Sequence, residues 1–211
     1  MAAEFDLSTL TTADGYKLLI GAIVPRPIAL VTTLSASGVI NAAPYSFFNA
    51  VSYDPPLVVL GIEARPDRRA KDTVENIREH QEFVVNLVDG AIAERMVVCA
   101  GNFPPEVDEL EQAGLTSAPA RQVAVPRIAE APVCLECRRY LSLEIGPARN
   151  LILGRILHIA VREDAVDQER LYIDQDVLGL IGRLAGAQYS RPGEIFEMPL
   201  IDAEAWIKKS K

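Results

Sequence analysis

The chain has 211 residues, of which 49% are hydrophobic and 24% charged, and its 29 acidic and 21 basic side chains give a net charge of −8. This size and composition are typical of one globular domain over residues 1–211 and exclude disordered and collagen-like proteins. The negative charge argues against nucleic-acid binding, which needs basic residues to neutralise phosphates, and against binding to anionic membrane surfaces.

Short β-branched and aliphatic runs, separated by proline and glycine, predict strands in the first half of the chain. The run 27–34 is followed by a short loop ending at Gly38, and 39–44 is its predicted hairpin partner. The runs 57–62 and 83–88 are two further predicted strands.

Two longer strands are predicted downstream. Residues 133–145 alternate between apolar and polar side chains, apart from Arg139, so one face of this strand is expected in the core and the other in water. Residues 151–161 are apolar on both faces, which is typical of a strand in the centre of a sheet.

Helices are predicted at a few connecting segments, which are 72–79, 91–100, 177–184 and, as a turn or short helix, 106–111. The first begins with Asp72 and has Glu75 three residues later, the pattern of a helix N-cap. Many strands, few helices and no regular alternation of the two predict a mainly β protein with helices, built as an antiparallel barrel.

Common catalytic motifs are missing: the sequence has no glycine-rich dinucleotide fingerprint, no P-loop and no nucleophile elbow. Two histidines, His80 and His158, are too few for a histidine-rich metal centre, so no metal is expected. Cys134 and Cys137 lie three residues apart on a predicted strand, where they face opposite sides and cannot share a metal ion. Cys99 has no neighbouring base or cation, so we do not expect a nucleophile there.

Residues 1–6 carry acidic side chains where a signal or transit peptide needs basic ones. No uncharged apolar run approaches the length of a membrane-spanning helix. Three cysteines are too few for a disulfide framework and suit a reducing compartment. We therefore expect a cytoplasmic protein without a membrane span.

A basic segment precedes the first predicted helix, with Arg65, Arg68, Arg69 and Lys71 against the single acid Asp67. The helix start adds free backbone N–H donors and Thr73 adds a hydroxyl, so the segment predicts a site for a phosphate monoester. A solvated basic loop is an equal alternative. Asp72 complicates the prediction, because a capping carboxylate competes with a phosphate for the same N–H groups.

Small, polar and aromatic residues are mixed in and after the predicted hairpin, at Thr32, Thr33, Asn41, Ala42, Ala43, Tyr45, Ser46 and Phe47. Small side chains let a flat ligand approach the backbone, whose polar groups can bind the edge of a heteroaromatic ring. An aromatic side chain such as Phe47 can cover a ring face. An ordinary hairpin with polar turn residues is the alternative.

Several motifs, taken in order and spacing, resemble the flavin reductase-like family: 25–33 (PRPIALVTT), 38–47 (GVINAAPYSF), 54–57 (DPPL), 72–77 (DTVENI), 82–88 (EFVVNLV), 107–115, 154–158, 182–184 and 189–190. Members of this family are FMN-binding split-barrel proteins and include flavoredoxins and the reductase components of two-component monooxygenases. The resemblance spans roughly residues 16–198.

The resemblance implies an antiparallel six-stranded split barrel, a homodimer, and hydride transfer from NADH or NADPH to FMN near the subunit interface. By position, residues 41–47 would line the isoalloxazine ring, and Thr73, Lys71 and Arg65 would hold the phosphate. His158 and Tyr189 would lie close to the flavin or the nicotinamide, although either fits a core position as well.

Three functions are compatible with these features. The first is an NAD(P)H-dependent FMN oxidoreductase that passes electrons to a small acceptor or to a partner such as a monooxygenase. Hydride transfer between stacked rings needs no strong acid or base, in keeping with the missing catalytic motifs. The second is a non-catalytic flavin-binding or electron-shuttle protein that a partner reduces. The third is a barrel that binds another phosphorylated ring, such as pyridoxal phosphate, or none.

Overall fold

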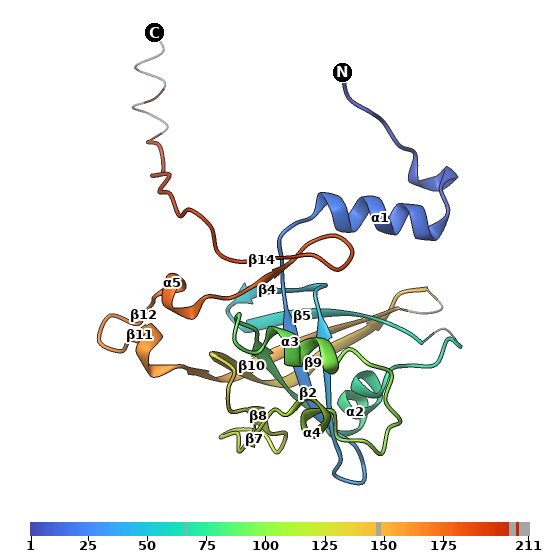
Figure 1. Cartoon of the computed structure of the whole chain (residues 1–211), viewed down its shortest axis with the longest axis vertical. Helices are drawn as coiled ribbons and strands as arrows, with labels where there is room; N and C mark the ends of the chain where they lie inside the picture. The colour runs from blue at the N-terminus through green and yellow to red at the C-terminus, as the bar shows by residue number, and fades with distance from the viewer. Residues whose placement is uncertain (66, 147–148, 203–205, 207–211) are drawn as a thin grey trace.

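A curved antiparallel sheet of seven strands forms the body of the molecule in the computed structural model, which describes residues 1–65, 67–146, 149–202 and 206 (Figure 1). The strands follow the order β3-β2-β6-β9-β10-β5-β4. They are β2 (Ala29–Leu34), β3 (Ile40–Tyr45), β4 (Phe48–Tyr53), β5 (Pro56–Glu63), β6 (Glu82–Leu87), β9 (Val133–Glu144) and β10 (Arg149–Val161).

The predicted hairpin is confirmed as β2 and β3, which pair antiparallel with Val31 opposite Ala43. Strands β5, β6 and β10 are also confirmed, and β10 lies between β9 and β5, away from the sheet edges as predicted. Six strands were expected, and the sheet has seven because β4 was not predicted. This strand lies at the edge of the sheet and is largely exposed, which is why its residues show no buried apolar run.

Strand β9 differs from its prediction, because its two faces are not simply core and water. Its first half is buried on both faces, since the segment 115–131 covers the outer one, and Cys134 and Cys137 pack into separate apolar clusters on opposite sides of the sheet. In its second half Leu141 and Leu143 are exposed. The two halves are offset by an irregularity in the pairing of β9 with β10.

Five α-helices accompany the sheet within the described residues: α1 (Thr12–Ala22), α2 (Asp72–His80), α3 (Ala93–Val98), α4 (Glu109–Ala113) and α5 (Gln175–Leu178). The helix predicted for 72–79 is confirmed, and the candidates at 91–100 and 106–111 correspond to the short α3 and α4. The helix predicted over 177–184 is wrong. Helix α5 stops at Gly179, whose φ of +57° reverses the chain, and the residues beyond it become extended.

Three two-residue strands form a second, smaller sheet. Strand β13 (Gly182–Arg183) pairs with both β1 (Arg26–Pro27) and β14 (Tyr189–Ser190) in a small separate sheet. The remaining two-residue strands form two small hairpins, β7 (Ser117–Ala118) with β8 (Arg127–Ile128) and β11 (Val166–Asp167) with β12 (Tyr172–Ile173). No described helix is both long and apolar enough to cross a bilayer.

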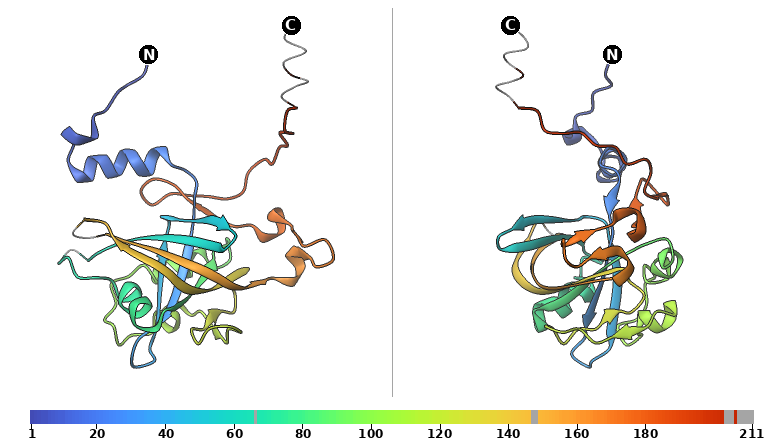
Figure 2. Two further views of the ribbon diagram at one scale, coloured as in Figure 1. Left: turned by 180° about the vertical axis from the view of Figure 1, so that it is seen from behind. Right: turned by 90° about the vertical axis from the view of Figure 1, so that its left-hand side faces the viewer.

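The apolar core has two main parts, one on each side of the sheet. Inside the barrel, Phe83, Leu60 and Ile152 pack together, and α2 closes this interior with Val74 and Ile77. On the outer side, α3, α4 and the segment 115–131 cover β2 and β6. The N-terminal segment and the C-terminal segment up to residue 202 extend from the same side of the barrel (Figure 2). Because Val74 and Ile77 pack into this core, the first turn of α2 lies next to β3.

Candidate functional site

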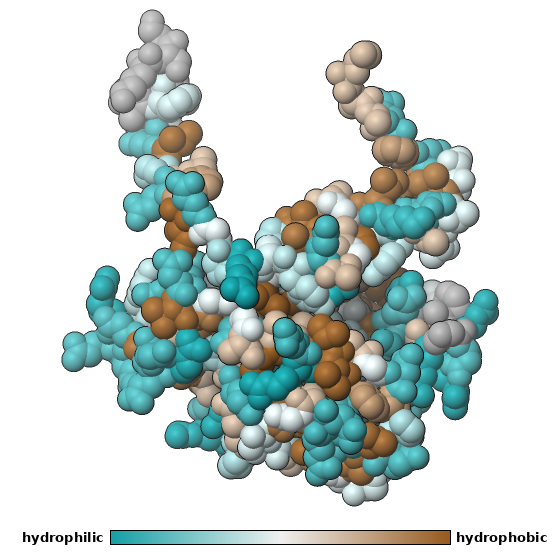
Figure 3. All heavy atoms as spheres, viewed as in Figure 1, coloured by the Kyte–Doolittle hydropathy of each residue, from teal (hydrophilic) through white to brown (hydrophobic). Residues whose placement is uncertain are grey.

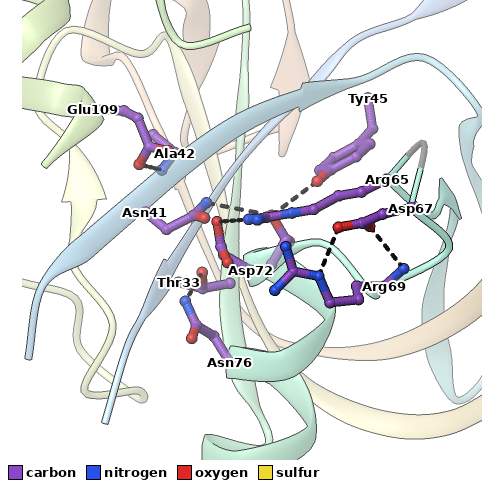
Figure 4. A network of polar contacts seen from close by, with 11 residues as sticks. Thr33, Asn41, Ala42, Tyr45, Arg65, Asp67, Arg69, Asp72, Asn76 and Glu109 are labelled. Carbon is purple, nitrogen blue, oxygen red and sulfur yellow. Dashed lines mark hydrogen bonds and ion pairs between the residues drawn. The ribbon is translucent and has the colours of Figure 1, made fainter. Parts of the chain in front are cut away.

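A cleft of about 510 Å³ lies where three parts of the chain meet. One wall is β3, the second is the first turn of α2 with the basic residues before it, and the third is the segment 99–105 after α3 together with Glu109. We call this space the β3–α2 cleft. Figure 4 shows side chains of β3, of the basic segment with the start of α2, and Glu109.

The first turn of α2 enters this cleft without a side-chain cap. Lys71 is the N-cap residue, and its side chain makes no capping hydrogen bond. The carboxylate of Asp72 pairs with the guanidinium of Arg65 (Figure 4). This corrects the expectation that Asp72 caps the helix and competes with an anion for its N–H groups. The uncapped first turn is therefore available as an anion-binding feature.

Thr73 joins the start of α2 to β3. Its Oγ1 accepts hydrogen bonds from the phenol of Tyr45 at 2.8 Å and from the side-chain amide of Asn41 at 3.3 Å. Burial raises the pKa of Tyr45 above its usual range, so the phenol stays neutral and donates. The sequence expectation that the basic segment and the Asn41–Phe47 segment lie together is confirmed.

The basic residues before α2 differ in what neutralises them. The guanidinium of Arg69 lies 2.7 Å from the carboxylate of Asp67. Lys71 lines the cleft, with its ammonium 5.7 Å from the centroid of the Tyr45 ring, and makes no ion pair within the described residues. Arg68 lines a different pocket. Lys71 is therefore the cation best placed to meet an anionic ligand.

The third wall carries a buried acid that sequence reasoning missed. Glu109 is 7% exposed, and its Oε2 accepts a hydrogen bond from the backbone N–H of Ala42 at 2.9 Å (Figure 4). Burial raises its pKa to about 7. The nearby thiol of Cys99 is buried as well, and its pKa rises to about 12, in agreement with the expectation that it is no nucleophile.

A second pocket of about 220 Å³ adjoins the cleft and shares with it Pro44, Tyr45 and Ala100. Its outer wall comes from α1 and from the β13–β14 hairpin. Here the guanidinium of Arg183 lies 4.5 Å over the ring of Tyr189 and hydrogen-bonds its phenol oxygen. The structure thus brings Tyr189 next to the predicted ligand-binding segment.

Arg26 holds the walls of the second pocket together. This buried guanidinium donates to the carbonyls of Ile20 and Ile23 at the end of α1 and to that of Leu184 in the hairpin, at 2.7–3.0 Å. Its Nε lies 3.3 Å from the hydroxyl of Ser46 after β3. The sequence contained this residue in its PRP motif but gave no sign of this role, because its partners are backbone carbonyls.

The structure brings most of the predicted site residues together. Lining the β3–α2 cleft are Asn41, Ala43, Tyr45, Arg65, Lys71 and Thr73, and lining the second pocket are Tyr45, Ser46 and Tyr189. Phe47 lies next to this site in an apolar pocket of about 290 Å³ beside α1. Ala42 lies on β3 but is buried behind the cleft, bonded to Glu109.

Besides Ala42 and Phe47, three more predicted residues, Thr32, Thr33 and His158, lie outside both pockets. Thr32 and Thr33 are fully buried and accept hydrogen bonds from the amides of Asn86 and Asn76, so here they connect strands and helix. His158 lies on β10, with its Nδ1 3.1 Å from a carboxylate oxygen of the buried Glu136. The described residues contain no group of three acids, histidines or cysteines able to hold a metal ion.

Comparison with known proteins identifies the family. The model of the flavin reductase like domain matches residues 21–180 of the chain. The chain belongs to the flavin reductase-like family. An uncharacterised relative from Halalkalibacterium halodurans is 42% identical over 195 residues, which cover 90% of this chain and 92% of the relative.

The structure of this flavin reductase-like protein is similar to two solved structures over almost the whole length of each chain. The 2-nitrobenzoate 2-nitroreductase NbaA of Pseudomonas fluorescens has a TM-score of 0.88 and 38% identity, covering 95% of this chain and 98% of that one. Nitrilotriacetate monooxygenase component B of Bacillus cereus has a TM-score of 0.90 and 35% identity, covering 94% and 99%. The expected mainly β split-barrel fold is confirmed, and the family is one of flavin-binding oxidoreductases.

Proposed function

We propose that this protein binds FMN in the β3–α2 cleft and the adjoining pocket, takes hydride from NADH or NADPH, and passes electrons to a small acceptor or a partner protein. The observation that carries the proposal is the contact of Thr73 with Asn41 and Tyr45. It joins a cationic helix start and the ligand-binding segment of β3 into one cleft, as a molecule with an anionic tail and a polar ring requires.

The phosphate end of FMN fits the start of α2. A phosphate monoester needs several N–H or O–H donors and positive charge, and an uncapped helix N-terminus supplies both. Lys71 adds an ammonium without a carboxylate partner among the described residues, and Thr73 adds a hydroxyl to the same wall. The residues present therefore suit the group.

The ring of FMN fits the edge of β3. This strand ends the sheet and, among the residues that the structure describes, pairs with β2 alone, so no other described strand uses its second edge. Of its backbone groups, the N–H of Ala42 is taken by Glu109. Ala43 and Pro44 line the cleft with small side chains, which lets a flat ring approach the strand.

Bound FMN would supply the redox chemistry, as hydride acceptor and donor. The residues of the chain have the simpler task of holding and orienting two rings at near-contact distance. We propose that Arg26 positions the pocket walls, because its hydrogen bonds connect α1 and the β13–β14 hairpin to the end of β3. We assign Arg183 and Tyr189 to the mouth through which the nicotinamide or the acceptor approaches.

The relatives suggest two classes of electron acceptor. One is named as a nitroreductase of 2-nitrobenzoate and the other as a component of nitrilotriacetate monooxygenase. A nitroaromatic acid and a flavin-using monooxygenase are therefore the acceptors to test first. The three free, buried cysteines suit the reducing conditions of the cytoplasm, where we place the protein.

We also propose that the protein is a homodimer. The C-terminal segment extends from the barrel with large apolar side chains 59–101% exposed, namely Ile195, Phe196, Met198, Leu200 and Ile201. Both projecting termini carry hydrophobic residues (Figure 3). A second copy would bury them at roughly 1.5–3 kcal/mol each. Light scattering of the full chain, compared with a variant ending at residue 190, tests this, and a monomeric full chain rejects it.

Visible spectroscopy of the purified protein tests the function directly. FMN is added first, and NADH or NADPH is then added under anaerobic conditions. We expect FMN to bind and its absorption near the visible maximum to bleach with at least one nucleotide. Binding without bleaching by either nucleotide would favour an electron shuttle reduced by a partner. If the protein does not bind FMN, or binds pyridoxal phosphate more tightly than FMN, the proposal is rejected.

A further inference from the structure

Glu109 is a buried acid in the wall of the β3–α2 cleft to which the proposed function gives no role. It is the first residue of α4 and faces the same cleft as the start of α2. No cation neutralises it within the described part of the chain, since the ion pairs there involve other carboxylates. A buried carboxylate without a cation is costly, and such a group tends to keep its proton.

Charged groups of both signs line the cleft around Glu109. The cations are Arg65, Arg69 and Lys71, of which Arg65 and Arg69 are paired with Asp72 and Asp67. Asp72 from α2 and Asp108 from its own helix are acids and disfavour a further negative charge. Cys99 after α3 and Tyr45 on β3 are neutral because burial raises both of their pKa values. With burial as the largest cause, the pKa of Glu109 rises to about 7.

A protonated carboxyl has one oxygen that accepts and one that donates. The accepting oxygen of Glu109 is identified by the structure, because Oε2 receives the N–H of Ala42 at 2.9 Å. No hydrogen bond joins Oε1 to another of the described residues, and Glu109 lines the cleft. A ligand in the cleft can therefore supply an acceptor for the protonated carboxyl group.

We propose that Glu109 contacts the ligand of this cleft: its protonated carboxyl donates a hydrogen bond from Oε1 to an acceptor atom of bound FMN, and its ionised form weakens binding. The inference rests on the proposed function. Ionisation acts in two ways, because it removes the donor and places a carboxylate in the same cleft as the FMN phosphate. The backbone bond to Ala42 persists in both forms, so the fold is not what changes.

Flavin affinity measured from pH 6 to pH 9 by fluorescence titration tests this. If only the protonated form binds, the competent fraction at pH 9 is about 1% and the dissociation constant rises about 100-fold. Glu109→Gln keeps an N–H donor at every pH, so we expect a flat profile and tight binding at pH 9. Glu111→Gln, on the exposed side of the same helix, is the matched control and should keep the wild-type profile.

Riboflavin separates the carboxyl from the phosphate, whose second ionisation near pH 6 also affects FMN binding. A hydrogen bond to the ring system or the ribityl chain makes riboflavin affinity fall with pH as well. Proton uptake by the wild-type protein is an independent measurement that needs no variant. Calorimetry at pH 8 in two buffers of different ionisation enthalpy should show nearly one proton bound per FMN.

The outcomes are distinct. A wild-type protein that binds no FMN at any pH overturns the proposed function, and this inference with it. A wild-type protein that binds FMN equally at pH 6 and pH 9, without proton uptake, overturns the inference alone. So does a folded Glu109→Gln variant that keeps the wild-type pH profile.

Discussion

Replacing Lys71 by methionine tests the phosphate site most directly. The ammonium lines the β3–α2 cleft beside the Tyr45 ring and makes no ion pair among the residues described. A hydrogen bond between charged groups contributes about 1.5–3 kcal/mol. At about 1.4 kcal/mol per factor of ten, the loss predicts FMN binding weaker by about 10- to 150-fold. Methionine retains an unbranched stem, so packing against the ring changes little.

Two controls make this measurement specific. Riboflavin has no phosphate, so its affinity should not change in Lys71→Met. Arg68→Met removes the same charge from the same segment, but Arg68 lines a different pocket with Glu144. Its effect on FMN should stay within about twofold, because exposed charges at a distance are screened by salt. Arg65 is a poorer choice, since its removal leaves the Asp72 carboxylate unpaired at the phosphate site.

Fluorescence titration with FMN and with riboflavin, at 0.15 M salt, gives both affinities. An FMN dissociation constant that changes less than twofold in Lys71→Met would show that this ammonium does not meet the phosphate. Equal weakening of FMN and riboflavin would point instead to damage of the cleft as a whole. Either result refutes the assignment of the helix start as the phosphate site.

Three further predictions concern stability. Gly154→Ala should lower the free energy of unfolding by about 2–3 kcal/mol, because the added Cβ would lie 2.2 Å from the Phe83 ring. Gly90→Ala is the control: Gly90 has open space around it, so its free energy of unfolding should change by less than about 0.5 kcal/mol. Urea unfolding measures both values. Arg26→Met should lower the free energy of unfolding by about 3 kcal/mol in the same assay and enlarge the second pocket, because three backbone carbonyls lose their hydrogen-bond donor. Unchanged stability would contradict the role of Arg26 in joining α1 to the β13–β14 hairpin. The folded pKa of Glu109, about 7 against 4.5 for an unperturbed glutamate, means that the folded state holds this proton more tightly. The stability that this proton contributes is present below pH 4.5 and is lost as the pH rises to 7. The free energy of unfolding of the wild-type protein should therefore fall by about 3 kcal/mol relative to that of Glu109→Gln over this interval. Parallel stability curves of the two proteins would contradict the raised pKa.

The sequence predicted those parts of the fold that local patterns encode. The hairpin of β2 and β3 followed from two apolar runs around a short loop that ends at Gly38, whose φ of +83° suits glycine. The start of α2 followed from its polar residues, although the cap was placed one residue late. Asp72 does not cap the helix because Arg65, seven residues earlier, binds its carboxylate. That contact depends on a loop conformation that no local pattern reveals.

Elements stabilised mainly by tertiary contacts could not be predicted. Helix α1 contains two glycines and buries only Ile20, so it lacks the apolar stripe of an amphipathic helix. Its position depends on Arg26, which binds the carbonyls at its end. Glu109 was hidden for a similar reason: in the sequence it is one of several acids around residues 106–111, and only the fold places it against the backbone of Ala42.

The place of β3 in the sheet explains why the candidate site lies there. An edge strand exposes unpaired N–H and C=O groups, which invites association with other chains unless something covers it. At this edge Glu109 takes the N–H of Ala42. Pro44 has no N–H, and Ala43 lies opposite Val31 in the β2–β3 ladder, so beside the β3–α2 cleft the free edge of the strand offers mainly carbonyl groups. A closed barrel would have buried these groups in a strand pair and offered only side chains to a ligand. Under the proposed function the polar edge of the flavin ring lies along this edge of β3, and the start of α2 is close to it because Thr73 contacts Asn41 and Tyr45 of the strand.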